Sequence, residues 1–79
     1  MTPDEARAAI TETLLEVAPD ADLDTLPPGA DLRDTLELDS LDFLNFVEAL
    51  GKRAGRRIDE DDYPQLATLD SGVAFLAGR

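Results

Sequence analysis

The sequence has 79 residues with 18 acidic and 7 basic side chains, and its formal charge of −11 should repel nucleic acid and anionic membranes and attract basic partner surfaces. It lacks cysteine and histidine, which excludes disulfides and thiolate metal sites and removes the side chain best suited to proton transfer near neutral pH. We therefore expect a single domain over residues 1–79 that works with partner proteins and is not itself an enzyme.

The first predicted helix runs from about residue 3 to residue 17. Thr2 is suited to cap it, Pro3 fits its first turn, and Glu5 completes a capping box three residues after Thr2. Pro19 ends the segment. Six residues recur at helical spacing and should face the core: Ala6, Ala9, Ile10, Thr13, Leu14 and Val17.

A long loop is predicted from about residue 20 to residue 38. Pro27-Pro28-Gly29 excludes regular structure locally, and a loop of this length in so small a domain is often functional. Because leucines recur throughout the loop, we expect it to be pinned onto the core. These leucines are Leu23, Leu26, Leu32, Leu36 and Leu38.

The second predicted helix starts at Asp39 or Ser40, either of which is suited to cap it, and runs to about Arg53. Its apolar residues cover more than one face, so we expect it to be the most buried element. They are Leu41, Phe43, Leu44, Phe46, Val47, Ala49 and Leu50.

Two shorter helical segments complete the prediction. Residues 59–63 should form a short turn before Pro64, and a last helix should begin near Thr68 and stop at Gly78. No alternating pattern indicates a strand. The fold class is therefore predicted to be all-α.

The junction between the long loop and the second helix places a serine, Ser40, among acidic and leucine residues. Backbone N–H groups at a helix start are unpaired and the helix dipole is positive there, so a phosphate ester on Ser40 would lie in a favourable field. The local alternative is that Ser40 is only a helix cap, as serine often is.

Several features occur in a fixed order along the chain: Asp39-Ser40-Leu41-Asp42 at a helix start, then Leu44, Val47 and Leu50, then Ile58 before the acidic residues 59–62, then Thr68-Leu69 at the last helix. With these features the sequence resembles the acyl carrier protein family over nearly its whole length. The resemblance implies a four-helix bundle with a long loop between helices 1 and 2 and a short third helix.

The resemblance also implies a function. A phosphopantetheinyl transferase would attach 4′-phosphopantetheine from coenzyme A to Ser40, and the thiol of this arm would carry an acyl group as a thioester. Acyl- or aminoacyl-loading and processing enzymes with basic docking surfaces would be the other partners. The positions expected to contact partners are Asp39, Leu41, Asp42, Asn45 and Glu48.

Three departures from the family favour a specialised pathway over general fatty-acid synthesis. Glu37 stands where the family often has glycine, and Asn45 replaces a frequent acid. A basic cluster follows the second helix, where it could serve a partner or pair with the helix dipole: Lys52, Arg53, Arg56 and Arg57.

We therefore predict a free-standing acyl carrier protein, for fatty acid or polyketide biosynthesis. The alternatives are an aminoacyl carrier and a non-carrier helical module that binds a basic partner. The segment Leu36-Glu37-Leu38 lacks the paired glycines usual in peptidyl carriers, which favours the acyl branch.

Metal binding and membrane insertion are not expected. Acids at positions 20, 22 and 24 begin like a calcium loop, but Thr25 replaces its glycine and Asp31 its glutamate. The chain shows neither a signal peptide nor a membrane span, so we expect a cytoplasmic monomer.

Overall fold

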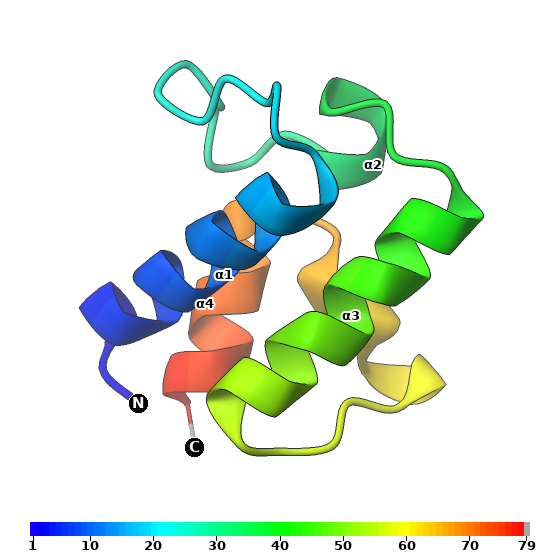
Figure 1. Cartoon of the computed structure of the whole chain (residues 1–79). Coiled ribbons are helices and arrows are strands. Elements are labelled where there is room, and N and C mark those ends of the chain that lie inside the picture. The colour runs from blue at the N-terminus through cyan, green and yellow to red at the C-terminus, as the bar shows by residue number, and fades with distance from the viewer. Residues whose placement is uncertain (79) are drawn as a thin grey trace.

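The computed structural model describes residues 1–78, in which all regular elements are helices. Their order is α1 (Pro3–Val17), α2 (Leu32–Thr35), α3 (Ser40–Ala54), the 3₁₀ helix η1 (Glu60–Leu66) and α4 (Leu69–Ala77). The helix α1 packs against both α3 and α4, and η1 packs against α4. Figure 1 shows α1 beside α4, with the long loop passing over one end of the bundle. This arrangement confirms the predicted all-α fold class.

The start of α1 is fixed by the predicted capping box. The Glu5 N–H donates to the Thr2 hydroxyl at 3.1 Å, and the Thr2 N–H donates to the Glu5 carboxylate at 2.8 Å. These hydrogen bonds, the backbone one first, hold the pKa of Glu5 below its ordinary value because they favour the charged carboxylate. The predicted inner face is confirmed: its residues are buried, except for Val17, which is half-buried.

The segment predicted as loop contains one turn of helix, so that prediction is wrong over residues 32–35. The Asp31 carboxylate caps α2 by accepting hydrogen bonds from the N–H groups of Arg33 and Asp34, at 2.9 and 3.1 Å. The Leu32 N–H donates to the Ala67 carbonyl oxygen at 2.7 Å. The loop is pinned as predicted, with three leucines buried and two half-buried: Leu26, Leu32 and Leu38, then Leu23 and Leu36.

The helix α3 buries only one side. Its inner residues are Phe43, Phe46, Val47 and Leu50. Leu41 and Leu44 remain 65% and 40% exposed, so the expectation that this helix is the most buried element is wrong. Only the inner side packs against the bundle, whereas the shorter α4 buries a larger share of its residues. Gly55 ends α3 with φ +70, a conformation that glycine adopts without steric cost.

The C-terminal elements start and end close to the predicted positions. The helix η1 extends through Pro64 to Leu66, which corrects the shorter turn predicted for residues 59–63. Thr68 caps α4, accepting a hydrogen bond from the Ser71 N–H at 3.0 Å. A Cβ atom on Gly72 would lie 3.0 Å from Ile10 Cδ1, so glycine allows α4 to approach α1 closely. Within residues 1–78, no helix combines the length and apolar character that a bilayer crossing requires.

Candidate functional site

Ser40 is the first residue of α3, and its hydroxyl takes no part in capping that helix. The cap is Asp39, whose carboxylate accepts a hydrogen bond from the Asp42 N–H at 2.8 Å. The Asp42 carboxylate accepts a longer bond in return from the Asp39 N–H, at 3.5 Å. The interpretation of Ser40 as an ordinary helix cap is therefore wrong. Its exposed side chain stands at the positive end of a 15-residue helix with its oxygen accessible.

Arg33, on α2, is the cation next to Ser40. Its Nη2 donates to the Ser40 Oγ at 3.2 Å, and its guanidinium carbon lies 5.5 Å from the centre of the Phe43 ring. A guanidinium in this position is suited to bind the oxygens of a phosphate group on Ser40. Arg33 is a residue of the site that the sequence pattern did not reveal. Its one available signal was a lone basic residue in an otherwise acidic loop.

The residues expected to contact partners lie around Ser40 and along the outer side of α3. Leu41, Asn45 and Glu48 are exposed and follow one another at helical spacing, so they form a single stripe. Asp39 is exposed at the start of this stripe, whereas Asp42 is half-buried and contributes to the capping box. The structure adds Leu44 to the stripe, which we call the outer face of α3: Leu41, Leu44, Asn45 and Glu48.

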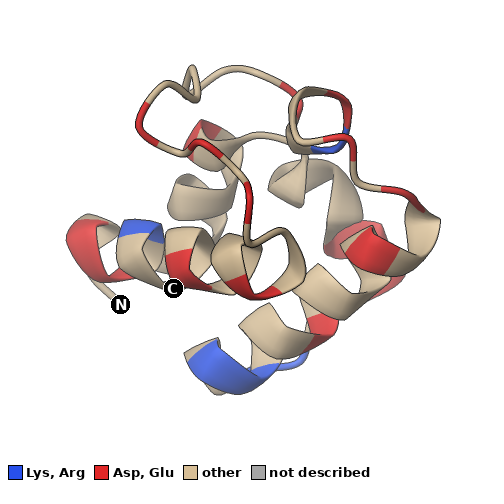
Figure 2. Ribbon diagram, turned by 45° about the horizontal axis from the view of Figure 1, so that its top comes forward, with Lys and Arg blue, Asp and Glu red and all other residues tan. Residues whose placement is uncertain are grey.

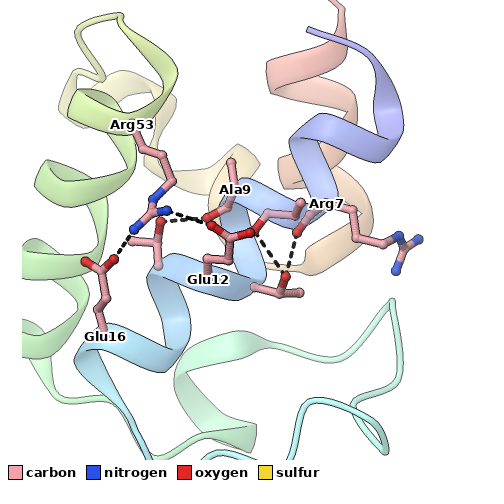
Figure 3. A network of polar contacts seen from close by, with 8 residues as sticks. Arg7, Ala9, Glu12, Glu16 and Arg53 are labelled. Carbon is pink, nitrogen blue, oxygen red and sulfur yellow. Dashed lines mark hydrogen bonds and ion pairs between the residues drawn. The ribbon is translucent and has the colours of Figure 1, made fainter.

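The charges of α3 are divided between its two ends. Figure 2 shows acidic residues at its start and basic residues at its end. At the basic end, Arg53 reaches across to α1 and forms ion pairs with Glu12, at 2.8 Å, and with Glu16 (Figure 3). Arg57 pairs with Asp59 at 2.8 Å, so two of the four basic side chains hold the protein's own acids.

An open cleft of about 530 Å³ begins beside Ser40 and runs between α3 and η1. Most of its lining is apolar, and the rings of Phe43 and Tyr63 meet edge to face in it with centroids 5.6 Å apart. Arg33 and Glu60 supply its charged groups. A flexible chain attached to Ser40 would have an apolar surface to lie against.

The loop before Ser40 keeps a backbone shape that favours glycine. Glu37 has φ +55, which is the left-handed region where most side chains are strained by about 1–2 kcal/mol. The next residue, Leu38, is buried and its N–H donates to the Arg33 carbonyl oxygen at 2.9 Å. The replacement of glycine therefore leaves a strained residue three positions before Ser40 and does not stop the loop from turning.

Comparisons with known proteins fit this geometry. A family model described as the phosphopantetheine attachment site matches residues 8–76. The chain belongs to this family. Members of the phosphopantetheine attachment family are carriers that hold 4′-phosphopantetheine covalently, so the predicted cofactor is confirmed.

A solved structure agrees with the family assignment. It is the solution structure of a protein from Anaplasma phagocytophilum described as an acyl carrier protein. The two chains are 25% identical and superpose with a TM-score of 0.82, over 99% of this chain and 91% of the other. No protein with a curated description matches the sequence.

Proposed function

We propose that this carrier is an acyl carrier protein in which the Ser40 hydroxyl is the attachment point of 4′-phosphopantetheine. The observation that carries the proposal is the state of that hydroxyl. It is exposed at the helix start, it is free of the capping role that Asp39 performs, and it lies beside Arg33.

The residues around Ser40 fit the attachment chemistry. The Ser40 Oγ would attack the phosphorus of coenzyme A that bears the pantetheine, forming one O–P bond while the pyrophosphate O–P bond breaks and adenosine 3′,5′-bisphosphate leaves. The hydroxyl proton must go to a base. The chain has no histidine, and the two neighbouring carboxylates are hydrogen-bonded in the capping box. The base therefore belongs to the transferase.

Arg33 and the first turn of α3 would hold the phosphate once it is attached. A phosphodiester on Ser40 keeps a negative charge, which Arg33 can meet with charge-assisted hydrogen bonds. The N–H groups of the first turn that are not bonded to Asp39 would be further donors for the phosphate oxygens. The arm supplies the thiol that carries the cargo as a thioester.

The outer face of α3 would bind the transferase and the loading enzymes. Its two leucines offer an apolar contact, and Glu48, with Asp39 at the helix start, offers negative charge to a basic docking surface. This composition supports recognition in which apolar burial supplies affinity and charge guides association.

The cleft beside Ser40 favours an acyl over an aminoacyl cargo, because its lining is mostly apolar and its aromatic rings can cover a hydrocarbon chain. The departure of the basic end of α3 from the family pattern supports a specialised pathway. An aminoacyl carrier is the competing function.

Intact-protein mass spectrometry tests the proposal. The purified chain is incubated with a broad-specificity phosphopantetheinyl transferase and coenzyme A, and it should gain the mass of one arm. Ser40→Ala should gain none, while Ser71→Ala, which changes the other serine of the chain, should gain the same mass as the parent. No gain in the parent would refute attachment of the arm to this chain, and a gain in Ser40→Ala would refute the assigned site.

A further inference from the structure

Lys52 continues the outer face of α3 by one turn. It follows Glu48 by four residues, which is the spacing of neighbours on one side of a helix, and both side chains are exposed. The same two residues line the shallow grooves on both sides of α3, which places them on the ridge between the grooves. A partner docked along this face would meet acidic residues first and a cation at the end of the helix.

The charge of Lys52 is not compensated within the protein, unlike the charges of two basic neighbours. Arg53 reaches α1 and pairs with two glutamates (Figure 3), and Arg57 pairs with Asp59. Within residues 1–78, no carboxylate lies within ion-pair distance of the Lys52 ammonium group. Arg56 is half-buried. Lys52 is therefore the exposed cation at this end of α3 that is available to another molecule.

The end of α3 does not depend on Lys52 for its hydrogen bonds. The Gly55 N–H donates to the Lys52 carbonyl oxygen at 3.3 Å. The Arg56 N–H donates to the Gly51 carbonyl oxygen at 3.0 Å. Arg53 lies in the same last turn and supplies a positive charge that interacts favourably with the helix dipole. The Lys52 side chain is therefore free to contact another protein.

Lys52 is close enough to Ser40 for one partner to cover both. The two residues are 12 positions apart on α3, which corresponds to about 18 Å at 1.5 Å per residue. An interface of standard size covers about 800 Å² on each partner, which is a patch roughly 30 Å across. The whole molecule measures 29 × 23 × 19 Å. An enzyme that acts on Ser40 and covers the outer face of α3 therefore also meets Lys52.

We propose that Lys52 selects the partner enzymes of this carrier. It disfavours a docking surface that is basic along its whole length, and it favours one that places a carboxylate opposite the end of α3. This inference rests on the proposed carrier function and adds the charge pattern of the partner. Cations of the partner would face Asp39 and Glu48, and its carboxylate would pair with Lys52. A cation opposite Lys52 would supply the repulsion by which a wrong partner is rejected.

The test measures kcat/KM for arm transfer by intact mass, with a phosphopantetheinyl transferase chosen for its basic docking surface. Lys52→Glu should raise kcat/KM roughly two- to tenfold at about 0.1 M salt, because an attraction between exposed charges replaces a repulsion. At about 1 M salt the gain should fall below twofold, since the Debye length shrinks from about 10 Å to about 3 Å. A glutamate at this position opposes the helix dipole, but a loss of stability would lower the rate and cannot produce the gain.

Arg7→Glu is the matched control, because it makes the same change of charge at another exposed position. Arg7 lies on α1, and its side chain points away from α3 in Figure 3. This variant should change kcat/KM by less than about twofold at the same salt, because its charge is screened from a partner docked on α3.

Transferase variants test the preference for a carboxylate. Each basic residue of the transferase docking surface is replaced by glutamate in turn, and kcat/KM is measured with the parent carrier and with Lys52→Glu. At least one transferase variant should load the parent faster than Lys52→Glu, because its new carboxylate attracts the lysine. Faster loading of Lys52→Glu by every transferase variant would overturn the preference for a carboxylate.

The other results bear on separate claims. An equal or lower kcat/KM for Lys52→Glu, or an equal gain in Arg7→Glu, would overturn selection by Lys52 and leave the carrier function intact, because loading would still occur. A parent chain that sediments as a dimer, and that Lys52→Glu makes monomeric, would overturn the proposal by assigning the lysine to a second copy of the chain. No loading of the parent or of any variant would refute the carrier function and this inference together.

Discussion

Leu41 lies immediately after Ser40 and is 65% exposed, so its truncation separates partner recognition from folding. Leu41→Ala opens no cavity in the core and should change the free energy of unfolding by less than about 0.5 kcal/mol. Full burial of a leucine side chain is worth about 1.5–3 kcal/mol, so a partner that covers its exposed two thirds gains about 1–2 kcal/mol. Loss of that contact should lower kcat/KM for arm transfer by roughly 5–30-fold.

The assay follows arm transfer by intact mass at a carrier concentration below saturation, and urea unfolding measures stability in parallel. Leu15→Ala is the matched control, because Leu15 is a leucine of similar exposure, 43%, on a different helix, α1. A loss below about twofold in Leu41→Ala, or an equal loss in Leu15→Ala, would refute the assignment of this leucine to the docking surface.

Three further substitutions test neighbouring parts of the account. Glu48→Lys should slow loading more at low salt than at high salt, since salt screens exposed charges; equal rates for variant and parent at low salt would argue against electrostatic docking through α3. Arg33→Gln should slow arm transfer by roughly two- to fivefold, because it weakens the charge-assisted contact at Ser40, and an equal effect of Arg7→Gln would attribute the loss to net charge alone. Glu37→Gly should raise the free energy of unfolding by up to about 1 kcal/mol, since relief of strain outweighs the added unfolded-state entropy; lower stability in urea unfolding would show that the Glu37 side chain makes a contact worth more than the strain.

The longer helices were predictable because each carries a cap and a periodic apolar face. Thr2, Asp39 and Thr68 begin α1, α3 and α4 at or near the predicted positions. The helix α2 was missed because four residues are too few for a periodic pattern, and Asp31, which caps it, was considered only as a failed calcium ligand. A proline usually marks the end of a helical segment, but Pro64 lies inside η1, where 3₁₀ geometry continues to Leu66.

The residues of the site that belong to a local sequence motif could be predicted, whereas those brought to it by the packing of other helices could not. Ser40 and the acids beside it are visible as a motif in the sequence. Arg33 becomes relevant only because α2 folds back on the start of α3. Leu44 was assigned to the core because a helix with apolar residues on several sides does not reveal which side is covered.

The location of the arm on the chain tests the central claim most directly. Fragmentation mass spectrometry of peptides from the loaded protein identifies the modified residue. The account predicts a phosphopantetheine ester on Ser40 alone, in the first turn of α3. Modification of Ser71, of a threonine, or of no residue under conditions that load a known carrier would contradict it.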